Sequence, residues 1–155
     1  MKKISIIIPS YKPANYLEKC LVSLENQTLT KDKYKVYIAL NGPKDDFEKY
    51  ILSLLSKMSF EYKYIYIEQA GVSNARNMLL DMYTEEYVVF IDDDDFVSEN
   101  YLENLLSVSS KDYIGISNIY NFERNISEKK ENYIGKTFKV LQDGEKSKYK
   151  IRKYF

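Results

Sequence analysis

Apolar residues follow two alternating patterns along the first two thirds of the chain. Continuous apolar and aromatic runs predict strands at ISIII (4–8), YKVYIAL (34–40), YKYIYI (62–67) and YVVFI (87–91), and DYIGISNIY (112–120) predicts a fifth. The segments between these runs carry apolar residues at helical spacing. Because parallel strands need crossover connections, the alternation predicts an α/β fold with a Rossmann-like, mostly parallel sheet flanked by helices.

The first predicted helix follows Pro9, which is expected to end the first strand. Asn15 and Glu18 have the spacing of an N-terminal capping box. One helical face then carries the apolar residues Leu17, Cys20, Leu21 and Leu24. This spacing predicts that Cys20 is a small core residue and not a reactive thiol.

Three more helices are predicted from the same spacing. Their apolar faces consist of Phe47, Ile51, Leu54, Leu55 and Met58; of Ala75, Met78, Leu79 and Met82; and of Tyr101, Leu102, Leu105 and Leu106. The sequence Gln69-Ala70-Gly71 is expected to separate the third strand from the second of these helices.

The charged residues divide the chain near residue 124. Residues 1–123 carry 13 basic and 19 acidic side chains, whereas residues 124–155 carry 10 and 4. We therefore expect a folded domain over 1–123 and, over 124–155, a basic irregular tail or the start of another region. The segment 146–155 is read as a solvated charge run, with contact to an anionic membrane surface as the alternative.

Several classes of site and location are excluded by composition. The chain has no His and one Cys, which excludes Ser/His/Asp and Cys/His nucleophiles, His or Cys zinc sites and an internal disulfide. A metal would be bound by oxygen ligands and would be Mg, Mn or Ca. No apolar run is long enough to cross a bilayer, so a cytoplasmic location, possibly peripheral at the inner face of the membrane, is expected, and no nucleic-acid partner is expected.

Four consecutive carboxylates, Asp92 to Asp95, follow the YVVFI run. Two carboxylates about 6 Å apart repel by roughly 3 kcal/mol at an effective dielectric of about 20. The run is either a solvated turn, with Asp95 or Ser98 capping the next helix, or a site for a hard cation. A calcium loop fits poorly because its Gly and its distal Glu are missing, and no glycine-rich phosphate loop occurs.

Three polar segments are expected at one edge of the sheet, because ligands bind at the carboxyl ends of parallel strands. They are residues 9–13, 41–43 and 92–95. In GVSNARNMLL (71–80), Arg76 lies near the start of a helix and could grip a phosphate or make a local ion pair.

Taken together, SIIIPSYKPANYLEKCLVSLENQ, ALNGPKDD, GVSNARN and EYVVFIDDDDF resemble, in order and spacing, the nucleotide-sugar half of family 2 glycosyltransferases. The resemblance covers residues 3 to about 106. It implies the GT-A fold and an inverting, Mn- or Mg-dependent transfer of a sugar from a nucleotide-diphosphate sugar, most often a UDP-sugar, to a hydroxyl acceptor. It further implies a role in glycan or polysaccharide synthesis with a glycan or lipid-linked acceptor.

The resemblance also implies roles for individual residues. Pro9, Ser10 and Tyr11 correspond to the loop that packs on the nucleoside, although Tyr11 could equally be half-buried packing. Arg76 corresponds to the arginine on the diphosphate side. Of the D-x-D acids, Asp92 is expected on the ribose and the metal, Asp94 on the metal, and Asp93 in an assisting position. Asp95 matches the acid that often follows the D-x-D element in this family.

This chain departs from the family pattern in two respects. Leu40-Asn41-Gly42-Pro43 stands where Asp-Asp-Gly-Ser is common, so Asn41 replaces the acid expected to bind uracil, and Lys12 replaces a common Asn. The catalytic base is expected beyond Phe155, because Asp143 and Glu145 lack its motif context. The fold is therefore expected to be truncated on its C-terminal side.

Two other functions remain open from the sequence. The chain could be a truncated, non-catalytic nucleotide-sugar-binding module. An Asp-based phosphatase resembling the haloacid dehalogenase family is the weaker alternative, because that motif normally lies on the first strand and is followed by Thr or Ser and Gly.

Overall fold

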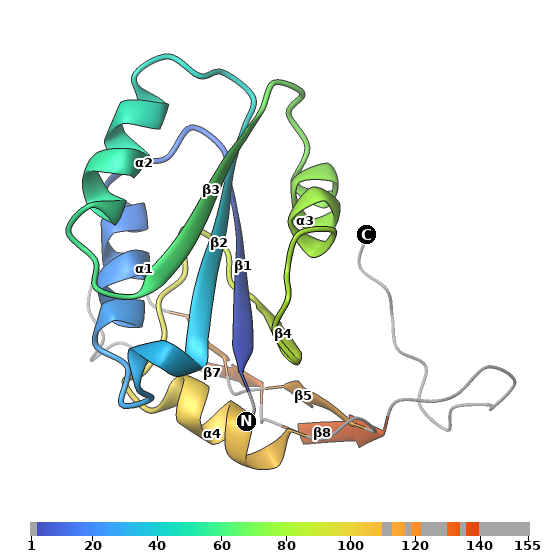
Figure 1. Cartoon of the computed structure of the whole chain (residues 1–155). Coiled ribbons are helices and arrows are strands. Elements are labelled where there is room, and N and C mark those ends of the chain that lie inside the picture. The colour runs from blue at the N-terminus through green and yellow to red at the C-terminus, as the bar shows by residue number, and fades with distance from the viewer. Residues whose placement is uncertain (1–2, 110–112, 117–118, 122–129, 134–135, 140–155) are drawn as a thin grey trace, which may run out of the picture. The chain divides into compact units, whose positions relative to one another are not determined.

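A four-stranded parallel sheet forms the centre of the N-terminal unit, Met1–Leu106 (Figure 1). The computed structural model describes residues 3–109, 113–116, 119–121, 130–133 and 136–139. The sheet has the strand order β3-β2-β1-β4, and every pair of neighbours is parallel. Its strands are β1 (Ile4–Ser10), β2 (Tyr34–Asn41), β3 (Glu61–Ile67) and β4 (Tyr87–Phe90). This arrangement confirms the predicted α/β class.

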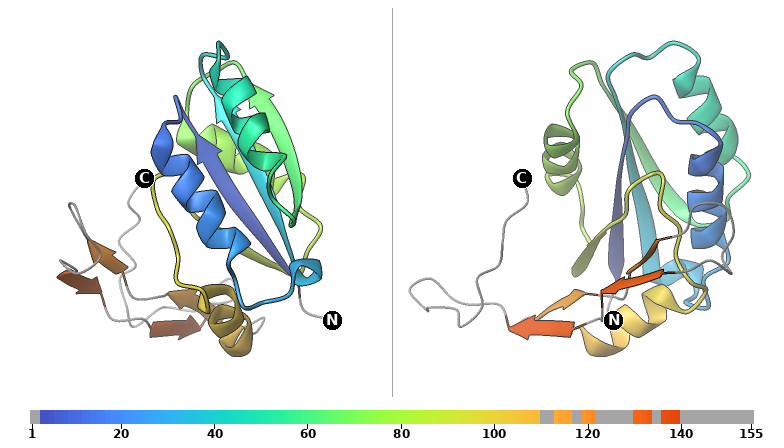
Figure 2. Two further views of the ribbon diagram at one scale, coloured as in Figure 1. Left: turned by 90° about the vertical axis from the view of Figure 1, so that its left-hand side faces the viewer. Right: turned by 180° about the vertical axis from the view of Figure 1, so that it is seen from behind.

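Helices cover both faces of this sheet (Figures 1 and 2). Helices α1 and α2 lie on one face, and α3 lies on the other. The helices are α1 (Asn15–Glu25), α2 (Phe47–Leu55), α3 (Val72–Leu80) and α4 (Tyr101–Val108), with a 3-10 turn, η1, at Lys31–Lys33. The predicted strand and helix alternation is confirmed through residue 108.

Strand β1 is the most buried element of the sheet. All seven of its residues are buried, because it has a neighbour on each side and helices on both faces. Ile4, Ile6 and Ile8 belong to the core shared with α1 and α2, while Ile7 packs in a smaller core with Ala75 and Leu79 of α3. Burying each such side chain is worth roughly 1.5–3 kcal/mol. Cys20 is also fully buried, as predicted.

The prediction that Pro9 ends the first strand is wrong. Strand β1 continues to Ser10, and Pro9 pairs in register with Ala39 of β2. The Ile7 carbonyl accepts the last bond from the β4 side, donated by Ile91 N. Backbone groups two residues apart in a strand point to the same side, so the missing N–H of Pro9 faces a side where the ladder has already ended.

The predicted capping box at the start of α1 is also wrong. Ala14 is the N-cap residue, and no side chain caps the helix. Asn15 is the first helical residue, so Asn15 and Glu18 lie one position too far along the helix for reciprocal capping.

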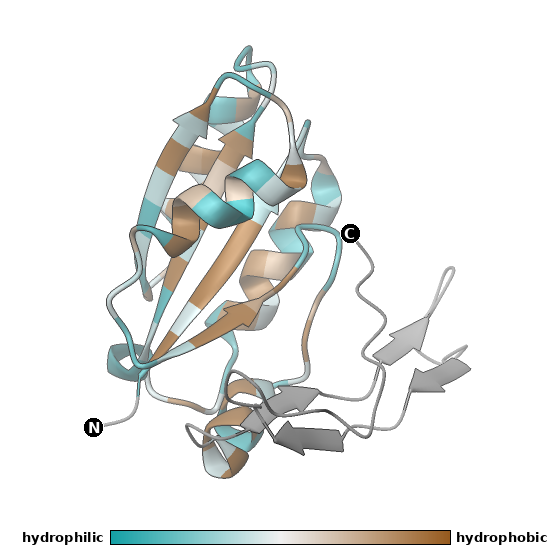
Figure 3. Ribbon diagram, turned by 90° about the vertical axis from the view of Figure 1, so that its right-hand side faces the viewer, coloured by the Kyte–Doolittle hydropathy of each residue, from teal (hydrophilic) through white to brown (hydrophobic). Residues whose placement is uncertain are grey.

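Strand β4 is less buried than its apolar sequence suggests. Within the described sheet it lies at an edge, and Phe90 is 49% exposed. Met78, predicted on the apolar face of α3, is 41% exposed, whereas Ala75 and Leu79 are buried. Figure 3 shows the apolar strands of the sheet from the α3 side. A continuous apolar run does not distinguish a central strand from an edge strand.

The second unit, Ser107–Phe155, contains two small antiparallel sheets. Strand β5 (Tyr113–Ile116) pairs with β8 (Lys136–Lys139), and β6 (Ile119–Asn121) pairs with β7 (Lys130–Tyr133). The predicted fifth strand is therefore two short strands that do not join the parallel sheet. The boundary near residue 124 stays a prediction.

The basic segment 146–155, with its alternative membrane contact, lies outside the described residues, as do Asp143 and Glu145. Where the structure describes the chain, its helices are too short or too polar to cross a bilayer.

A carboxylate fastens the start of β4 to the sheet. Glu85 accepts hydrogen bonds from the hydroxyls of Ser5 in β1 and Tyr37 in β2, both of which are buried. Partial burial by itself would raise the pKa of Glu85, but the hydrogen bonds from Ser5, Tyr37 and Thr84 outweigh it and hold the pKa below the ordinary value of 4.5. The ionised carboxylate therefore stabilises the attachment of β4.

Glu85→Gln should lower the free energy of unfolding at pH 7 by about 1–2 kcal/mol, because bonds to a charged acceptor become bonds to a neutral one. The folded-state pKa lies below the unfolded value, so the ionised group stabilises the fold above pH 4.5 and this contribution is lost as the pH falls through the lower value. The variant should thus lose less stability than the parent as the pH falls from above 4.5 through the lowered pKa of Glu85. Urea unfolding across this range measures both effects.

Glu68→Gln is the matched control, since it makes the same change at an exposed position. Equal urea midpoints for the Glu85 and Glu68 variants at every pH would contradict the role given to Glu85.

Candidate functional site

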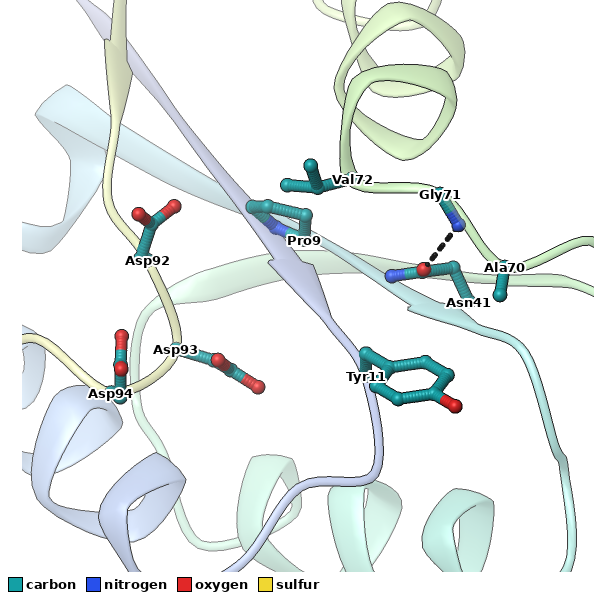
Figure 4. Close-up of a pocket in the computed structure, with 9 residues that line it drawn as sticks. All are labelled: Pro9, Tyr11, Asn41, Ala70, Gly71, Val72, Asp92, Asp93 and Asp94. Carbon is teal, nitrogen blue, oxygen red and sulfur yellow. Dashed lines mark hydrogen bonds between the residues drawn. The ribbon is translucent and has the colours of Figure 1, made fainter. Parts of the chain in front are cut away.

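The carboxyl ends of β1, β2 and β4 and the start of α3 line an open pocket of about 480 Å³ (Figure 4). Its lining residues are Pro9, Tyr11, Asn41, Ala70, Gly71, Val72, Asp92, Asp93 and Asp94. The three polar segments expected at one edge of the sheet therefore do meet there. Parallel pairing explains this, because it directs all the carboxyl ends to the same edge.

Six of the predicted site residues line the pocket: Pro9, Tyr11, Asn41, Asp92, Asp93 and Asp94. Ser10 and Arg76 are absent from the lining, but each contacts an acid that belongs to it. Sequence reasoning missed Ala70, Gly71 and Val72 as lining residues. The predicted break at Gln69-Ala70-Gly71 could have identified them. A segment that enters a helix at this edge of the sheet must pass beside the strand ends.

Asn41 connects three walls of the pocket. Its side chain is almost completely buried, at 3% exposure. The Nδ2 group donates to the Ser10 carbonyl oxygen at 2.8 Å, and Oδ1 accepts from the Gly71 backbone N–H at 2.9 Å, a bond drawn in Figure 4. The carboxamide thereby fixes the end of β1 relative to the start of α3.

Tyr11 presents a half-exposed ring at the pocket wall. A Cβ atom built on Gly42 would lie 2.6 Å from Tyr11 Cε2 and 2.9 Å from Cδ2, so the ring lies against the glycine backbone. Gly42 also has φ +98, a conformation that residues with a side chain rarely adopt. Only glycine allows both the turn after β2 and the close approach of the ring.

The acidic run forms a turn directly after the last bond of β4. Ile91 N donates to the Ile7 carbonyl at 3.1 Å, and Asp95 N donates to the Asp92 carbonyl at 3.1 Å. Helix α4 begins only at Tyr101, so Asp95 is not its cap. Ser98 lies next to this helix, and its carbonyl oxygen accepts from Tyr101 N.

Two of the acids have partners from other elements. Asp93 accepts a hydrogen bond from Ser10 Oγ at 2.5 Å, and Asp92 makes an ion pair with the Arg76 guanidinium of α3. Arg76 Nε is buried and has no hydrogen-bond partner among the described residues. Arg76 therefore has both a local partner in Asp92 and an unused donor.

The carboxylates raise the pKa of groups near them. Partial burial raises the pKa of Asp93, the charges of Asp94 and Asp92 add to this, and the Ser10 hydrogen bond opposes it. Burial, followed by the charges of Asp93 and the other three acids, raises the pKa of the Cys20 thiol to about 12. Cys20 is thus protonated and inert at neutral pH, as its place in the core predicted.

No three acid or thiol side chains converge on one point within the described ranges. In the view of Figure 4, the side chains of Asp92 and Asp94 point upward, whereas that of Asp93 extends to the right. These residues alone do not form a closed cage of protein ligands for a metal ion.

Solved structures with a similar fold are sugar-transferring proteins. Staphylococcus aureus TarS in complex with UDP-GlcNAc has a TM-score of 0.59 and 24% identity, over 68% of this chain and 30% of that chain. Mannosyltransferase PcManGT from Pyrobaculum calidifontis, in complex with GDP-Man and Mn²⁺, has a TM-score of 0.70 and 20% identity, over 77% and 36%. The sheet and its helices therefore have the GT-A fold.

Sequence comparison identifies the family. Glycosyltransferase GlyA of Streptococcus pneumoniae serotype 4 is 35% identical over 125 residues, which are 79% of this chain and 18% of GlyA. The chain therefore spans less than a fifth of the length of this relative. The family described as "Glycosyl transferase family 2" matches residues 5–154. The chain belongs to glycosyl transferase family 2.

Proposed function

We propose that this chain is the donor-binding part of an enzyme that transfers a sugar from a nucleotide-diphosphate sugar to an acceptor hydroxyl in glycan or polysaccharide synthesis. The observation that carries the proposal is the pocket in which the acids after β4 face Tyr11 and Asn41 at the ends of β1 and β2. Family membership supports the reaction class. TarS and PcManGT bind UDP-GlcNAc and GDP-Man on the same fold, which supports a nucleotide-sugar donor.

The nucleoside is proposed to lie between Tyr11 and Asn41. The exposed face of the Tyr11 ring offers a surface for stacking, with Pro9 beside it in the lining. After its two internal bonds, the Asn41 carboxamide retains one N–H and one lone pair. An amide can both donate and accept, so it suits uracil without requiring it. Among nucleotide-sugar donors, a UDP-sugar is the one that we propose first.

The diphosphate is proposed to lie beside Arg76 and the acidic turn. Arg76 is paired with Asp92, and a phosphate oxygen beside it would give the guanidinium a second anionic partner. Ser10 holds Asp93 at the edge of the same region.

The donor set fits Mn²⁺ or Mg²⁺. Magnesium sites of this kind use one or two protein carboxylates and complete the coordination with substrate phosphates and water, so a closed protein cage is not required. Asp94 and Asp92 are the proposed ligands, and both carboxylates are exposed beside the pocket. When bound, the metal supplies positive charge to the leaving diphosphate.

The proposed transfer inverts the configuration of the sugar. The acceptor oxygen forms a bond to the anomeric carbon from the face opposite the diphosphate, the bond to the diphosphate breaks, and the hydroxyl proton passes to a general base. No residue of the chain is assigned as this base, because the carboxylates that line the pocket are those proposed for the donor and the metal. The acceptor, a glycan or a lipid-linked acceptor, stays a prediction.

No structural observation favours the phosphatase alternative. Asp92 would be its nucleophile, but the carboxylate is engaged by the Arg76 guanidinium. A non-catalytic nucleotide-sugar-binding module would use the same pocket, and transfer of radiolabelled sugar to an acceptor distinguishes it from an enzyme.

Asp94→Asn should reduce the gain in UDP affinity caused by Mn²⁺ at least about tenfold, since an amide is a poorer ligand for a hard cation. The fold should be unchanged because Asp94 is exposed. Calorimetry with UDP and GDP, each with and without Mn²⁺, measures both the base preference and the metal dependence.

Asp81→Asn, an exposed acid at the far end of α3, is the control and should bind like the parent. Absence of heat with both nucleotides in all conditions contradicts donor binding. An unchanged effect of Mn²⁺ in Asp94→Asn contradicts only the role of that residue.

Gly42→Ala should destabilise the fold by about 1–2 kcal/mol through backbone strain. It should also weaken UDP binding, because the new Cβ would lie 2.6 Å from the Tyr11 ring and displace it. Adding Tyr11→Ala separates the two effects, since the strain persists while the clash disappears. Urea unfolding and calorimetry on the two single variants and the double variant check this. Additive changes in stability would contradict contact between Gly42 and the ring.

A further inference from the structure

Gln27 is a buried amide that lies just after α1 and outside the pocket. Only 8% of the residue is exposed. Its Nε2 group donates to the carbonyl oxygens of Ser23 at 2.9 Å and Ser98 at 2.8 Å, and Oε1 accepts from Leu102 N at 2.9 Å. One side chain thereby joins the end of α1 to both ends of the segment that follows the acidic turn.

Neighbouring bonds fasten the same segment. Val97 N donates to Ser23 Oγ at 3.2 Å, and Thr28 N donates to the Glu99 carbonyl at 2.8 Å. The end of α1 therefore holds residues 97–102 through two side chains and one backbone group. Of these, Gln27 supplies the most bonds and is the most buried.

The acidic turn lies between two fixed points as a result. On one side, Ile91 is bonded to Ile7 of β1. On the other side, the bonds of Ser23 and Gln27 fix Val97 and Ser98. The four carboxylates between these points repel one another. Arg76 and Ser10 hold Asp92 and Asp93, so a turn with only its first end fixed would relax mainly by moving Asp94 and Asp95 away.

We infer that Gln27 is a positioning residue that holds Asp92 to Asp95 in the arrangement required for binding of donor and metal. The ligand in this inference rests on the proposed function. Loss of the Gln27 amide leaves the buried Leu102 N–H without its partner and removes the bond that ties the Ser98 carbonyl to the end of α1, so the segment after the turn loosens. A loosened turn must become ordered when a cation binds, and the conformational entropy lost in this step weakens binding. This happens although none of the carboxylates has changed.

The test uses Gln27→Met, which preserves the length of the side chain and removes all three bonds. Calorimetry with UDP, with and without Mn²⁺, is expected to show that the gain in affinity due to Mn²⁺ falls about tenfold. Affinity without Mn²⁺ should stay within about twofold of the parent, because Gln27 does not touch the wall formed by Tyr11 and Asn41. Ser23→Ala removes one bond to this segment, the one from Val97 N, together with a local bond to the Cys20 carbonyl, and should show a smaller loss in the same direction.

Ile51→Val, a core change in α2, is the control for lowered stability alone. It should shift the melting temperature without changing the Mn²⁺ effect. If Gln27→Met changes the Mn²⁺ effect no more than Ile51→Val does, the inference is overturned. If Gln27→Met does not fold, the Mn²⁺ effect in Ser23→Ala is compared with that in Ile51→Val, and equal effects overturn the inference.

Amide hydrogen exchange at Asp95 tests the inference independently of the nucleotide. Asp95 N donates to the Asp92 carbonyl within the turn, so loosening of the turn should speed its exchange at least about tenfold in Gln27→Met but not in Ile51→Val. If the parent chain shows no Mn²⁺-dependent binding, the proposed metal site fails, and the inference about Gln27 is then tested by the exchange rate alone. Equal exchange rates in the parent and Gln27→Met would then overturn its positioning role.

Discussion

Complete burial of β1 is the constraint on which the geometry of the pocket depends. Each of its seven residues is buried between two strands and two helical layers, so its position is determined by the core on both faces. Its carboxyl end carries the carbonyl oxygen of Ser10 that accepts the Asn41 bond and the hydroxyl that donates to Asp93. Through these two bonds, the packing of β1 determines where β2, α3 and the acidic turn meet.

Repulsion among the carboxylates is the main cost of this arrangement. The fold opposes it with specific partners: the Arg76 guanidinium at Asp92, the Ser10 hydroxyl at Asp93, and the bonds from α1 that hold the chain after the turn. These contacts keep negative charge at the pocket edge and leave Asp94 exposed beside it. A preformed acidic edge is suited to a cation bound together with a polyanionic ligand.

Most of the residues that the family resemblance led us to expect at a donor site line the pocket. Asn41 shows how the two kinds of information differ. The sequence identified it as an amide in place of a common acid, whereas the structure shows that both ends of the amide already hold pocket walls together. Its freedom to respond to a base is correspondingly limited, and Tyr11 is left as the more exposed surface on that wall.

The sequence by itself determined the α/β class, the order of strands and helices through residue 108, and most of the pocket lining, because hydrophobic periodicity is local and parallel strands end at one edge. The edge position of β4, the exposure of Phe90 and the continuation of β1 through Pro9 were decided by tertiary structure. So were the Arg76–Asp92 pair, the Gln27 contacts and the entry of Gly71 and Val72 into the pocket. The physical reason is that each depends on which distant backbone comes within hydrogen-bonding or packing distance, and a one-dimensional pattern does not contain that information.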